Sequence, residues 1–253
     1  MRILSRLVLI LALIYLGICA ALFVCQRSMI YHPVPSAIND PDSILTLKVA
    51  DADLLVSSRP HQGAKAIIYF GGNGEDVSRD LPIFSAQFPD YALYFLHYRG
   101  YGGSTGSPSE TSFAADALAL FDRVYAEHSD VVVMGRSLGT GVAVRLASQR
   151  PASRLILITP YDSIQAIAEQ RYSSFPVRWL LLDKFESWRY APLIKAPTLL
   201  IKAEHDEVIP AVNTDRLYAS FNKGVAMLKV IANAGHNDIG RSADYFSVIQ
   251  SGL

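Results

Sequence analysis

A serine flanked by two glycines, in Gly135-Arg136-Ser137-Leu138-Gly139, is the clearest chemical signal in the sequence. The apolar, β-branched run 131–134 before it predicts a buried strand, and the apolar face of residues 142–147 after it predicts a helix. A sharp strand-to-helix turn lifts a serine hydroxyl above a sheet, and the glycines let the backbone pass close to its neighbours. We therefore expect Ser137 to be a nucleophile at a helix N-terminus, where unpaired N–H groups favour negative charge. The alternative is an ordinary turn that happens to contain a serine.

A nucleophilic serine needs a general base, and a histidine most often serves. His236 is the best candidate because Ala234-Gly235-His236 directly follows the last predicted strand. A glycine there lets the loop turn the imidazole back over the rim of the sheet. Four other histidines, which lie in connectors or at the ends of elements, are expected to be structural or solvated: His32, His61, His97 and His128.

The histidine in turn needs a carboxylate that orients it, and this should come from a strand end between the serine and the histidine. A predicted strand over residues 197–203 is followed by Glu204-His205-Asp206-Glu207. Asp206 is our choice, ahead of Glu207 and Glu204, and Asp162 after the preceding strand is the main rival. The chain order Ser, Asp, His is typical of one α/β fold class and differs from the order in trypsin-like or subtilisin-like enzymes.

An oxyanion formed at the serine needs two backbone N–H donors. Leu138, the residue after the nucleophile, is expected to supply one. The other should come from the loop Gly71-Gly72-Asn73-Gly74 after the strand 66–70, where glycines let the backbone approach a carbonyl oxygen. We assign the N–H of Asn73, with Gly72 or Gly74 as alternatives. No Lys-[Ser/Thr] follows, so this loop is not a phosphate-binding P-loop.

Composition and charge narrow the function classes. The chain has 253 residues, of which 51% are hydrophobic and 18% charged, and its formal net charge is zero. That length suffices for one α/β domain, and neutrality gives no reason to expect nucleic acid as a partner. Both cysteines, Cys19 and Cys25, lie in the N-terminal apolar run. A thiol nucleophile, a zinc–thiolate site and a disulfide framework are thereby excluded from the globular part.

Residues 7–25 form an uncharged apolar run. As a helix it would span about 28 Å, close to one bilayer core. The run continues past the poor cleavage site Cys19-Ala20-Ala21, which favours an uncleaved signal anchor over a cleaved signal peptide, a lipoprotein signal or a buried core helix. Arg2 and Arg6 precede it and only Arg27 follows it closely, so the positive-inside rule predicts a single-pass membrane protein with an extracytoplasmic catalytic domain.

The rest of the sequence divides into a connector and one domain. Residues 1–26 are expected to form the transmembrane anchor, residues 27–44, with three prolines, an extended connector, and residues 45–253 the domain. Within the domain an antiparallel hairpin comes first, and strand and helix patterns then alternate. This alternation predicts a mostly parallel sheet with helices on both faces, whose strand ends form one ligand-binding rim. The expected strands are 45–49, 53–57, 66–70, 91–97, 130–135, 154–159, 197–203 and 225–232. The expected helices are 77–87, 108–127, 138–149, 211–221 and 242–250.

One segment, residues 160–192, interrupts this alternation and is too aromatic for a solvated loop. It predicts a small cap packed on the core. We expect the inner face of the cap to wall an apolar pocket over Ser137, with Phe175 and Trp179 binding substrate there.

The combined motifs resemble one branch of the α/β-hydrolase superfamily, the membrane-anchored serine aminopeptidase-like and acyl-protein-thioesterase-like hydrolases. The resemblance rests on residues 26–31 (QRSMIY), 98–104 (YRGYGGS), 107–110 (SPSE) and 135–139 (GRSLG). It implies an α/β-hydrolase fold with an eight-stranded sheet and a Ser137/Asp206/His236 triad. Two positions depart from the pattern, since His97 and Gly71 stand where relatives often have Asp and His.

These features predict a serine hydrolase that cleaves an acyl ester, thioester or amide through an acyl-enzyme intermediate, without metal or other cofactor. Its expected partners are a small-molecule or acylated substrate and the membrane, and the sequence does not indicate an oligomeric state. The alternative is a non-catalytic binding or scaffold protein on the same fold. An oxidoreductase would require a nucleotide-binding loop or a set of metal ligands, and the sequence contains no motif for either.

Overall fold

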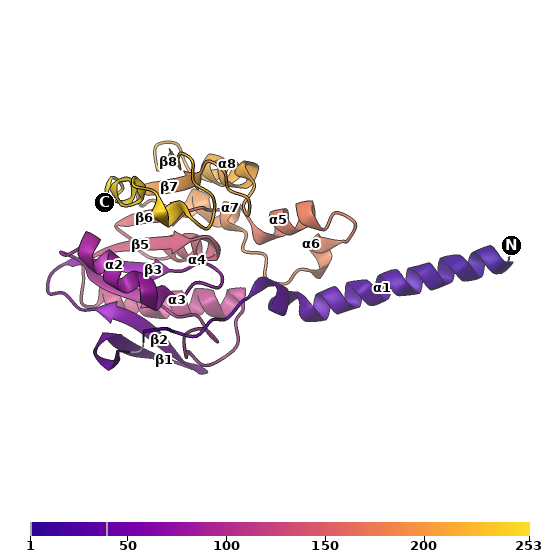
Figure 1. Cartoon of the computed structure of the whole chain (residues 1–253), viewed down its shortest axis with the longest axis horizontal. Helices are drawn as coiled ribbons and strands as arrows, with labels where there is room; N and C mark the ends of the chain where they lie inside the picture. The colour runs from indigo at the N-terminus through magenta and orange to yellow at the C-terminus, as the bar shows by residue number, and fades with distance from the viewer. Residues whose placement is uncertain (1, 39) are drawn as a thin grey trace.

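The computed structural model describes residues 2–38 and 40–253, among which eight strands form one sheet (Figure 1). The strands are β1 (Ile44–Val49), β2 (Ala52–Arg59), β3 (Lys65–Phe70), β4 (Ala92–Leu96), β5 (Asp130–Arg136), β6 (Arg154–Ile158), β7 (Thr198–Ala203) and β8 (Ala226–Ile231). Their order is β1-β2-β4-β3-β5-β6-β7-β8. β1 and β2 pair as an antiparallel hairpin, β2 also pairs antiparallel with β4, and the remaining pairs are parallel. The predicted mostly parallel, eight-stranded sheet is confirmed.

Helices cover both faces of this sheet because its central strands carry apolar side chains on both faces. Val131 and Val133 of β5 pack in one core cluster and Val132 and Met134 in the other, as the two-residue period of a strand requires. The helices are α1 (Arg2–Ile30), α2 (Asp80–Gln87), α3 (Glu110–Tyr125), α4 (Leu138–Ala147), α5 (Ile164–Arg171), α6 (Val177–Leu180), α7 (Ser187–Tyr190), α8 (Ala211–Ser220) and α9 (Tyr245–Gln250). Short 3₁₀ turns are Pro41–Ser43, Val77–Arg79, Ala191–Leu193 and Ile239–Arg241.

α3 begins later than the sequence pattern suggested. Its N-cap is Ser109, whose hydroxyl accepts the N–H of Ser112, while the Ser112 hydroxyl accepts the N–H of Ser109. The carboxylate of Glu110, the first residue of α3, accepts the N–H groups of Lys184 and Phe185. Glu110 therefore ties the cap segment to α3.

α1 projects from the body of the molecule (Figure 1) and is long and apolar enough to cross a membrane. It continues to Ile30, so the first residues of the expected connector, from Arg27 on, are helical. The helix can run this far because the first proline of the connector is Pro33, and a proline disfavours helix only from the residue before it.

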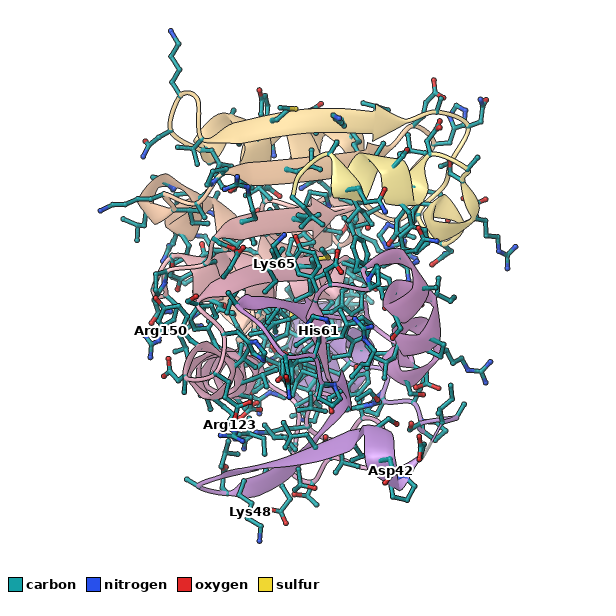
Figure 2. The ribbon with its side chains drawn as sticks, turned by 90° about the vertical axis from the view of Figure 1, so that its left-hand side faces the viewer. Asp42, Lys48, His61, Lys65, Arg123 and Arg150 are labelled. Atoms are coloured by element: carbon teal, nitrogen blue, oxygen red, sulfur yellow. The ribbon has the colours of Figure 1, made fainter. Side chains whose placement is uncertain are left out.

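The two rims of the sheet differ. The carboxyl ends of the parallel strands point toward α1, and β5 leads there directly into Ser137 (Figure 1). Figure 2 views the molecule from the left-hand side of Figure 1, away from α1, where polar side chains such as His61, Lys65 and Arg150 lie. The candidate site is therefore at the rim that adjoins the apolar helix.

Candidate active site

Ser137 is held at a strained turn between β5 and α4. Its φ of 47° and ψ of −117° are rare for a residue with a side chain, and such strain is typical of functional sites. A Cβ on Gly135 would lie 2.5 Å from the carbonyl oxygen of Gly139, and one on Gly139 only 2.0 Å from the carbonyl oxygen of Phe70. Close backbone packing therefore requires both glycines, as predicted from the sequence.

The structure brings Ser137, His236 and Asp206 together in one hydrogen-bonded row. The Nε2 atom of His236 lies 2.9 Å from the Oγ of Ser137. Its Nδ1 atom lies 3.0 and 2.9 Å from the two carboxylate oxygens of Asp206. Asp206 also accepts the N–H groups of Val208 and Ile209, so its carboxylate is fixed in direction. With the His236 and Asp206 side chains each only 6% exposed, the row can move a proton away from the serine in a shielded site.

The carboxylates considered as rivals of Asp206 have other partners. Buried Asp162 accepts the side-chain amide of Asn213 at 2.7 Å. Glu207 accepts the backbone N–H of His236 at 3.0 Å, and this hydrogen bond lowers the pKa of Glu207. Glu204 accepts the backbone N–H of Asn233, in the loop after β8, at 2.8 Å. None of the three contacts the imidazole among the described residues, although Glu207 holds the loop that carries it.

The two N–H groups predicted to bind an oxyanion are free. Neither the N–H of Leu138 nor that of Asn73 has an acceptor among the described residues. Gly72 cannot take this role in the present geometry, because its N–H donates to Glu75 at 2.7 Å. A Cβ built on Gly72 would lie 3.5 Å from the Cβ of Ser137, so the glycine loop passes directly beside the nucleophile.

The Asn73 side chain anchors this loop to the end of α1. Its amide donates to the carbonyl oxygen of Ile30 at 2.6 Å. Its carbonyl oxygen accepts the hydroxyl of Tyr101 at 2.8 Å and the N–H of His32 at 2.9 Å. The loop therefore has a fixed position relative to both the sheet and the helix.

Glu75 connects the elements around the nucleophile, and sequence reasoning missed it. Its Oε1 accepts the hydroxyl of buried Tyr69 at 2.6 Å. Its Oε2 accepts the N–H of Gly72 at 2.7 Å and Nη1 of Arg136 at 2.8 Å. Arg136 also donates to the carbonyl oxygen of His236 at 3.3 Å. The sequence did contain a signal for this pair: Arg136 is a charged residue inside the serine motif, and Glu75, of opposite charge, directly follows the glycine loop.

A second carboxyl group, Asp80, lies beside Glu75. Burial, the negative charge of Glu75 and a hydrogen bond to Glu75 raise the pKa of Asp80 to about 7. Arg136 opposes this shift through its positive charge. A half-buried carboxyl group with a pKa near neutrality therefore lies next to Glu75, the residue that binds the glycine loop.

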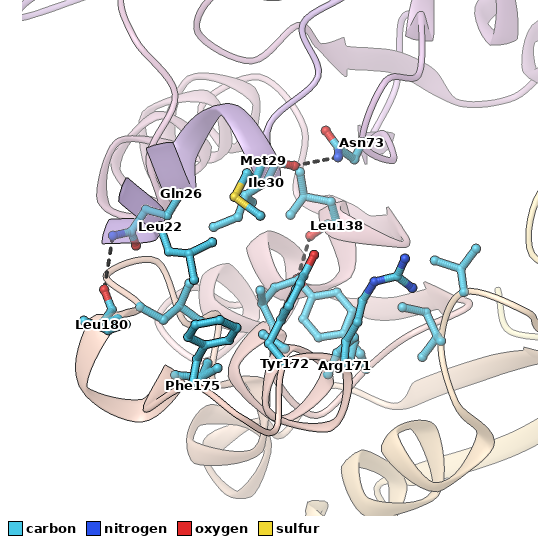
Figure 3. Close-up of a pocket in the computed structure, with 18 of the residues that line it drawn as sticks. Leu22, Gln26, Met29, Ile30, Asn73, Leu138, Arg171, Tyr172, Phe175 and Leu180 are labelled. Atoms are coloured by element: carbon cyan, nitrogen blue, oxygen red, sulfur yellow. Dashed lines mark hydrogen bonds between the residues drawn. The ribbon is translucent and has the colours of Figure 1, made fainter. Parts of the chain in front are cut away.

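An apolar cavity of about 510 Å³ opens above Ser137 (Figure 3). Phe175, which the sequence assigned to substrate binding, lines it. Trp179, assigned to the same role, does not line it and is 82% exposed, so the geometry does not support that assignment. The reason is that α6 makes a single turn: Val177 and Leu180 face the cavity, and Trp179 between them faces outward.

The two departures from the expected pattern have structural partners. His97 is buried, its Nε2 lies 2.8 Å from the hydroxyl of Ser57, and burial lowers its pKa. The carbonyl oxygen of Gly71 accepts the hydroxyl of Tyr98 at 2.9 Å. Within residues 2–38 and 40–253, no group of three or more His, Cys, Asp and Glu could hold a metal ion.

Comparisons with known proteins agree with this architecture. Residues 65–190 match the family described as serine aminopeptidase, S33. An uncharacterized protein of Mycobacterium tuberculosis is 31% identical over 247 residues, which cover 90% of this chain and 86% of that one. The lysophosphatidylserine lipase ABHD12 of Rattus norvegicus is 32% identical over 219 residues, covering 76% of this chain and 54% of the lipase, so this chain spans about half the length of that relative.

Solved structures extend the comparison to the fold. The esterase Pf2001 of Pyrococcus furiosus matches with a TM-score of 0.68 at 18% identity, over 88% of this chain and 95% of the esterase. At that identity the likeness shows the shared fold alone. With the family match and the M. tuberculosis relative, it identifies this chain as a hydrolase of the α/β-hydrolase superfamily that belongs to its serine aminopeptidase S33-like family.

Proposed function

We propose that this chain is a membrane-anchored serine hydrolase in which Ser137, His236 and Asp206 cleave acyl esters. The observation that carries the proposal is the hydrogen-bonded row of these three side chains beneath an apolar cavity. Thioesters and amides share the same acyl-transfer chemistry and are the other members of the substrate class.

In the first step the Oγ of Ser137 attacks the acyl carbonyl carbon while Nε2 of His236 takes the hydroxyl proton. Asp206 accepts the hydrogen bond from Nδ1–H, keeps the other nitrogen free as a base, and stabilises the imidazolium that forms. The carbonyl oxygen becomes an oxyanion that accepts the N–H groups of Leu138 and Asn73, each worth about 3 kcal/mol. The ester C–O bond then breaks, and the leaving oxygen takes the proton from His236.

In the second step water replaces the leaving group. His236 takes a proton from the water, whose oxygen bonds to the acyl carbon. The same two N–H groups stabilise the second oxyanion. The bond between the acyl carbon and the Oγ of Ser137 breaks, the serine recovers its proton from the imidazolium, and the carboxylic acid leaves.

The size and lining of the cavity support the proposal that the substrate is an ester with an acyl chain. Most of its lining is apolar, and about 510 Å³ is enough for a ligand of that kind. The relative named as a lysophosphatidylserine lipase points to the same class, an ester of a lipid that carries a single acyl chain.

The N-terminal helix supports attachment to a membrane. Arg2 and Arg6 on one side and Arg27 on the other favour a cytoplasmic N-terminus and an exported catalytic domain. The division into an anchor over residues 1–26, a connector over 27–44 and a domain over 45–253 is part of this proposal.

The test is hydrolysis of p-nitrophenyl esters, from acetate to dodecanoate, by the full chain in detergent micelles. We expect hydrolysis by the wild type and a loss of at least roughly 10³-fold in kcat for Ser137→Ala. A variant that hydrolyses as fast as the wild type would contradict the proposal. A wild type that melts cooperatively but hydrolyses no ester would favour the non-catalytic scaffold instead.

A further inference from the structure

The helix predicted as a membrane anchor also forms a wall of the cavity. Leu22, Gln26, Met29 and Ile30 of α1 line the same space as Ser137. Figure 3 shows them opposite Tyr172 and Phe175 of the cap. A flexible tether would not complete a cavity in this way, so the position of α1 relative to the cap bears on substrate binding.

Polar contacts hold α1 against the cap. They are the hydroxyl of Tyr15 to the carbonyl oxygen of Ser174 (3.0 Å), Nε2 of Gln26 to the carbonyl oxygen of Leu180 (3.1 Å), the N–H of Leu182 to Oε1 of Gln26 (2.7 Å) and Nε of Arg27 to Asp183 (3.0 Å). The rings of Tyr15 and Phe175 also stack, with centroids 5.8 Å apart. Gln26 is only 7% exposed, and a buried amide must be hydrogen-bonded. These contacts give α1 one defined docking position.

The contacts also set the depth of the cap relative to the membrane. Tyr15 lies within the apolar run 7–25 and precedes its last residue by about 15 Å along the helix axis. The cap segment that touches Tyr15, at Ser174 and Phe175, therefore lies beside the middle of the expected membrane span, whereas Leu180 and Leu182, which contact Gln26, lie beside its carboxyl-terminal end. Figure 1 shows α5 and α6 next to this end of α1.

The outer face of the cap, which we define as Trp179 and Leu182, exposes large apolar side chains near the carboxyl-terminal end of the span. Trp179 is 82% exposed and Leu182 54%, and neither lines the cavity. Exposed apolar patches mark interaction sites, and Trp and Tyr are enriched where proteins meet the membrane interface. Leu182 also donates its backbone N–H to Gln26 of α1, and we expect the exposed apolar surface of α1 to face the bilayer.

We propose that the outer face of the cap is seated in the lipid bilayer beside α1, and that acyl chains reach Ser137 from the bilayer through the space between α1 and the cap. The second half of this statement rests on the proposed function, whereas the first half does not. Trp179 then contacts lipid rather than substrate.

The seating can be measured without any activity, because Trp179 and Trp188 are the two tryptophans of the chain. Trp188→Phe leaves Trp179 as the only tryptophan, so its emission can be excited selectively in the full chain, reconstituted in phosphatidylcholine vesicles with bromine at acyl positions 6 and 7. We expect the fluorescence to fall to roughly half or less of its value in unbrominated vesicles, as for a side chain at the membrane interface.

Trp179→Phe is the matched control, since it leaves Trp188 in a pocket lined by charged side chains such as Arg178, Lys184 and Glu186. We expect little quenching of Trp188. If brominated lipid quenches Trp179 no more than Trp188, the cap is not seated in the bilayer and the inference is overturned.

The role of α1 as a cavity wall is tested by Leu22→Trp, with Leu16→Trp as control. Leu22 lines the cavity, whereas Leu16 on the same helix does not line it and is 61% exposed. We expect Leu22→Trp to lower kcat/KM for the dodecanoyl ester about 10-fold and for the acetyl ester less than about 2-fold, because the added ring occupies space needed only by a long chain. Leu16→Trp should change neither.

The outcomes separate the two proposals. If Leu22→Trp hydrolyses every chain length as the wild type does, α1 is only a tether, and the proposed function stands. If the wild type hydrolyses no ester and Ser137 does not react with a fluorophosphonate, the proposed function fails. The bromolipid measurement still decides the seating of the cap in that case.

Discussion

The two sides of the cavity are built in different ways. On the sheet side, backbone strain at Ser137 and short hydrogen bonds among His236, Asp206, Glu75 and Arg136 fix each group. On the other side, α1 and the cap contribute mostly apolar side chains, joined by a few polar contacts. Under the proposed function, this difference assigns the reaction to the sheet side and the selection of the acyl group to the other side.

Variants on the two sides of the cavity should therefore affect ester hydrolysis in different ways. A change on the sheet side should lower the rate for every ester by the same factor, since it alters the reacting groups. A change on the side of α1 and the cap should depend on chain length, since it alters binding of the acyl chain. Hydrolysis of an acetyl and a dodecanoyl ester distinguishes the two in each variant below.

The largest effect among these variants is expected for Asp206→Asn. Losing the carboxylate favours the wrong imidazole tautomer and removes the charge that stabilises the imidazolium, so kcat should fall by roughly 10³- to 10⁴-fold for both esters. Asp162→Asn is the matched control, because Asp162 is also buried but contacts Asn213 instead of the imidazole. Equal losses in the two variants would show that Asp206 has no special role.

A smaller, uniform loss is expected for Glu75→Ala. Removing this carboxylate frees the N–H of Gly72 and Nη1 of Arg136, so the loop that carries Asn73 shifts. A displacement near 1 Å can cost about 10²-fold, so we expect kcat to fall about 10- to 100-fold with KM nearly unchanged. Glu75→Gln, which keeps an acceptor for these groups, should restore most of the rate. A change confined to KM would argue against this positioning role.

A loss that depends on chain length is expected for Phe175→Ala. The phenyl ring lines the cavity, so its removal should lower kcat/KM about 10-fold for the dodecanoyl ester and less than about 2-fold for the acetyl ester. Trp179→Ala, a second aromatic truncation in the same cap, should leave both values unchanged in detergent micelles because Trp179 does not line the cavity. The assignment fails if Phe175→Ala slows both esters alike.

The smallest effect is one on stability, at Asp80. Its pKa in the folded protein, about 7, lies above the ordinary aspartate value, so between pH ~4 and ~7 the folded state holds a proton that the unfolded chain has released. Stability contributed by this group therefore falls as the pH rises through that window. Asp80→Asn removes the cost and should gain on the order of 2 kcal/mol at pH 8, or about 4 °C in Tm, but nearly nothing at pH 4. An equal gain at both pH values would contradict the raised pKa.

Local patterns predicted the fold well, because strand and helix periodicity and the glycines around Ser137 reflect packing over short stretches. The hairpin, the alternation and the elbow are of this kind. Ser137, Asp206 and His236 could be named because each follows a predicted strand directly, and parallel strands bring their carboxyl ends to one rim.

What the sequence could not give depends on contacts between distant segments. Trp179 and Phe175 are both aromatic residues of the cap segment, and only the folded structure shows that Phe175 lines the cavity while Trp179 faces outward. The contact of Gln26 with Leu180 joins residues more than 150 positions apart. Glu75 was missed for the same reason, since its partners Tyr69, Gly72 and Arg136 meet only after the sheet has formed.

The central claim is that His236 activates Ser137, and covalent labelling tests it most directly. The full chain in detergent micelles would be treated with a fluorophosphonate, and the modified peptide would be located by mass spectrometry in the wild type, Ser137→Ala and His236→Ala. The account predicts one adduct, on Ser137 of the wild type, with labelling slowed at least roughly 10³-fold in His236→Ala. Labelling at another serine, or at an unchanged rate without His236, would contradict it.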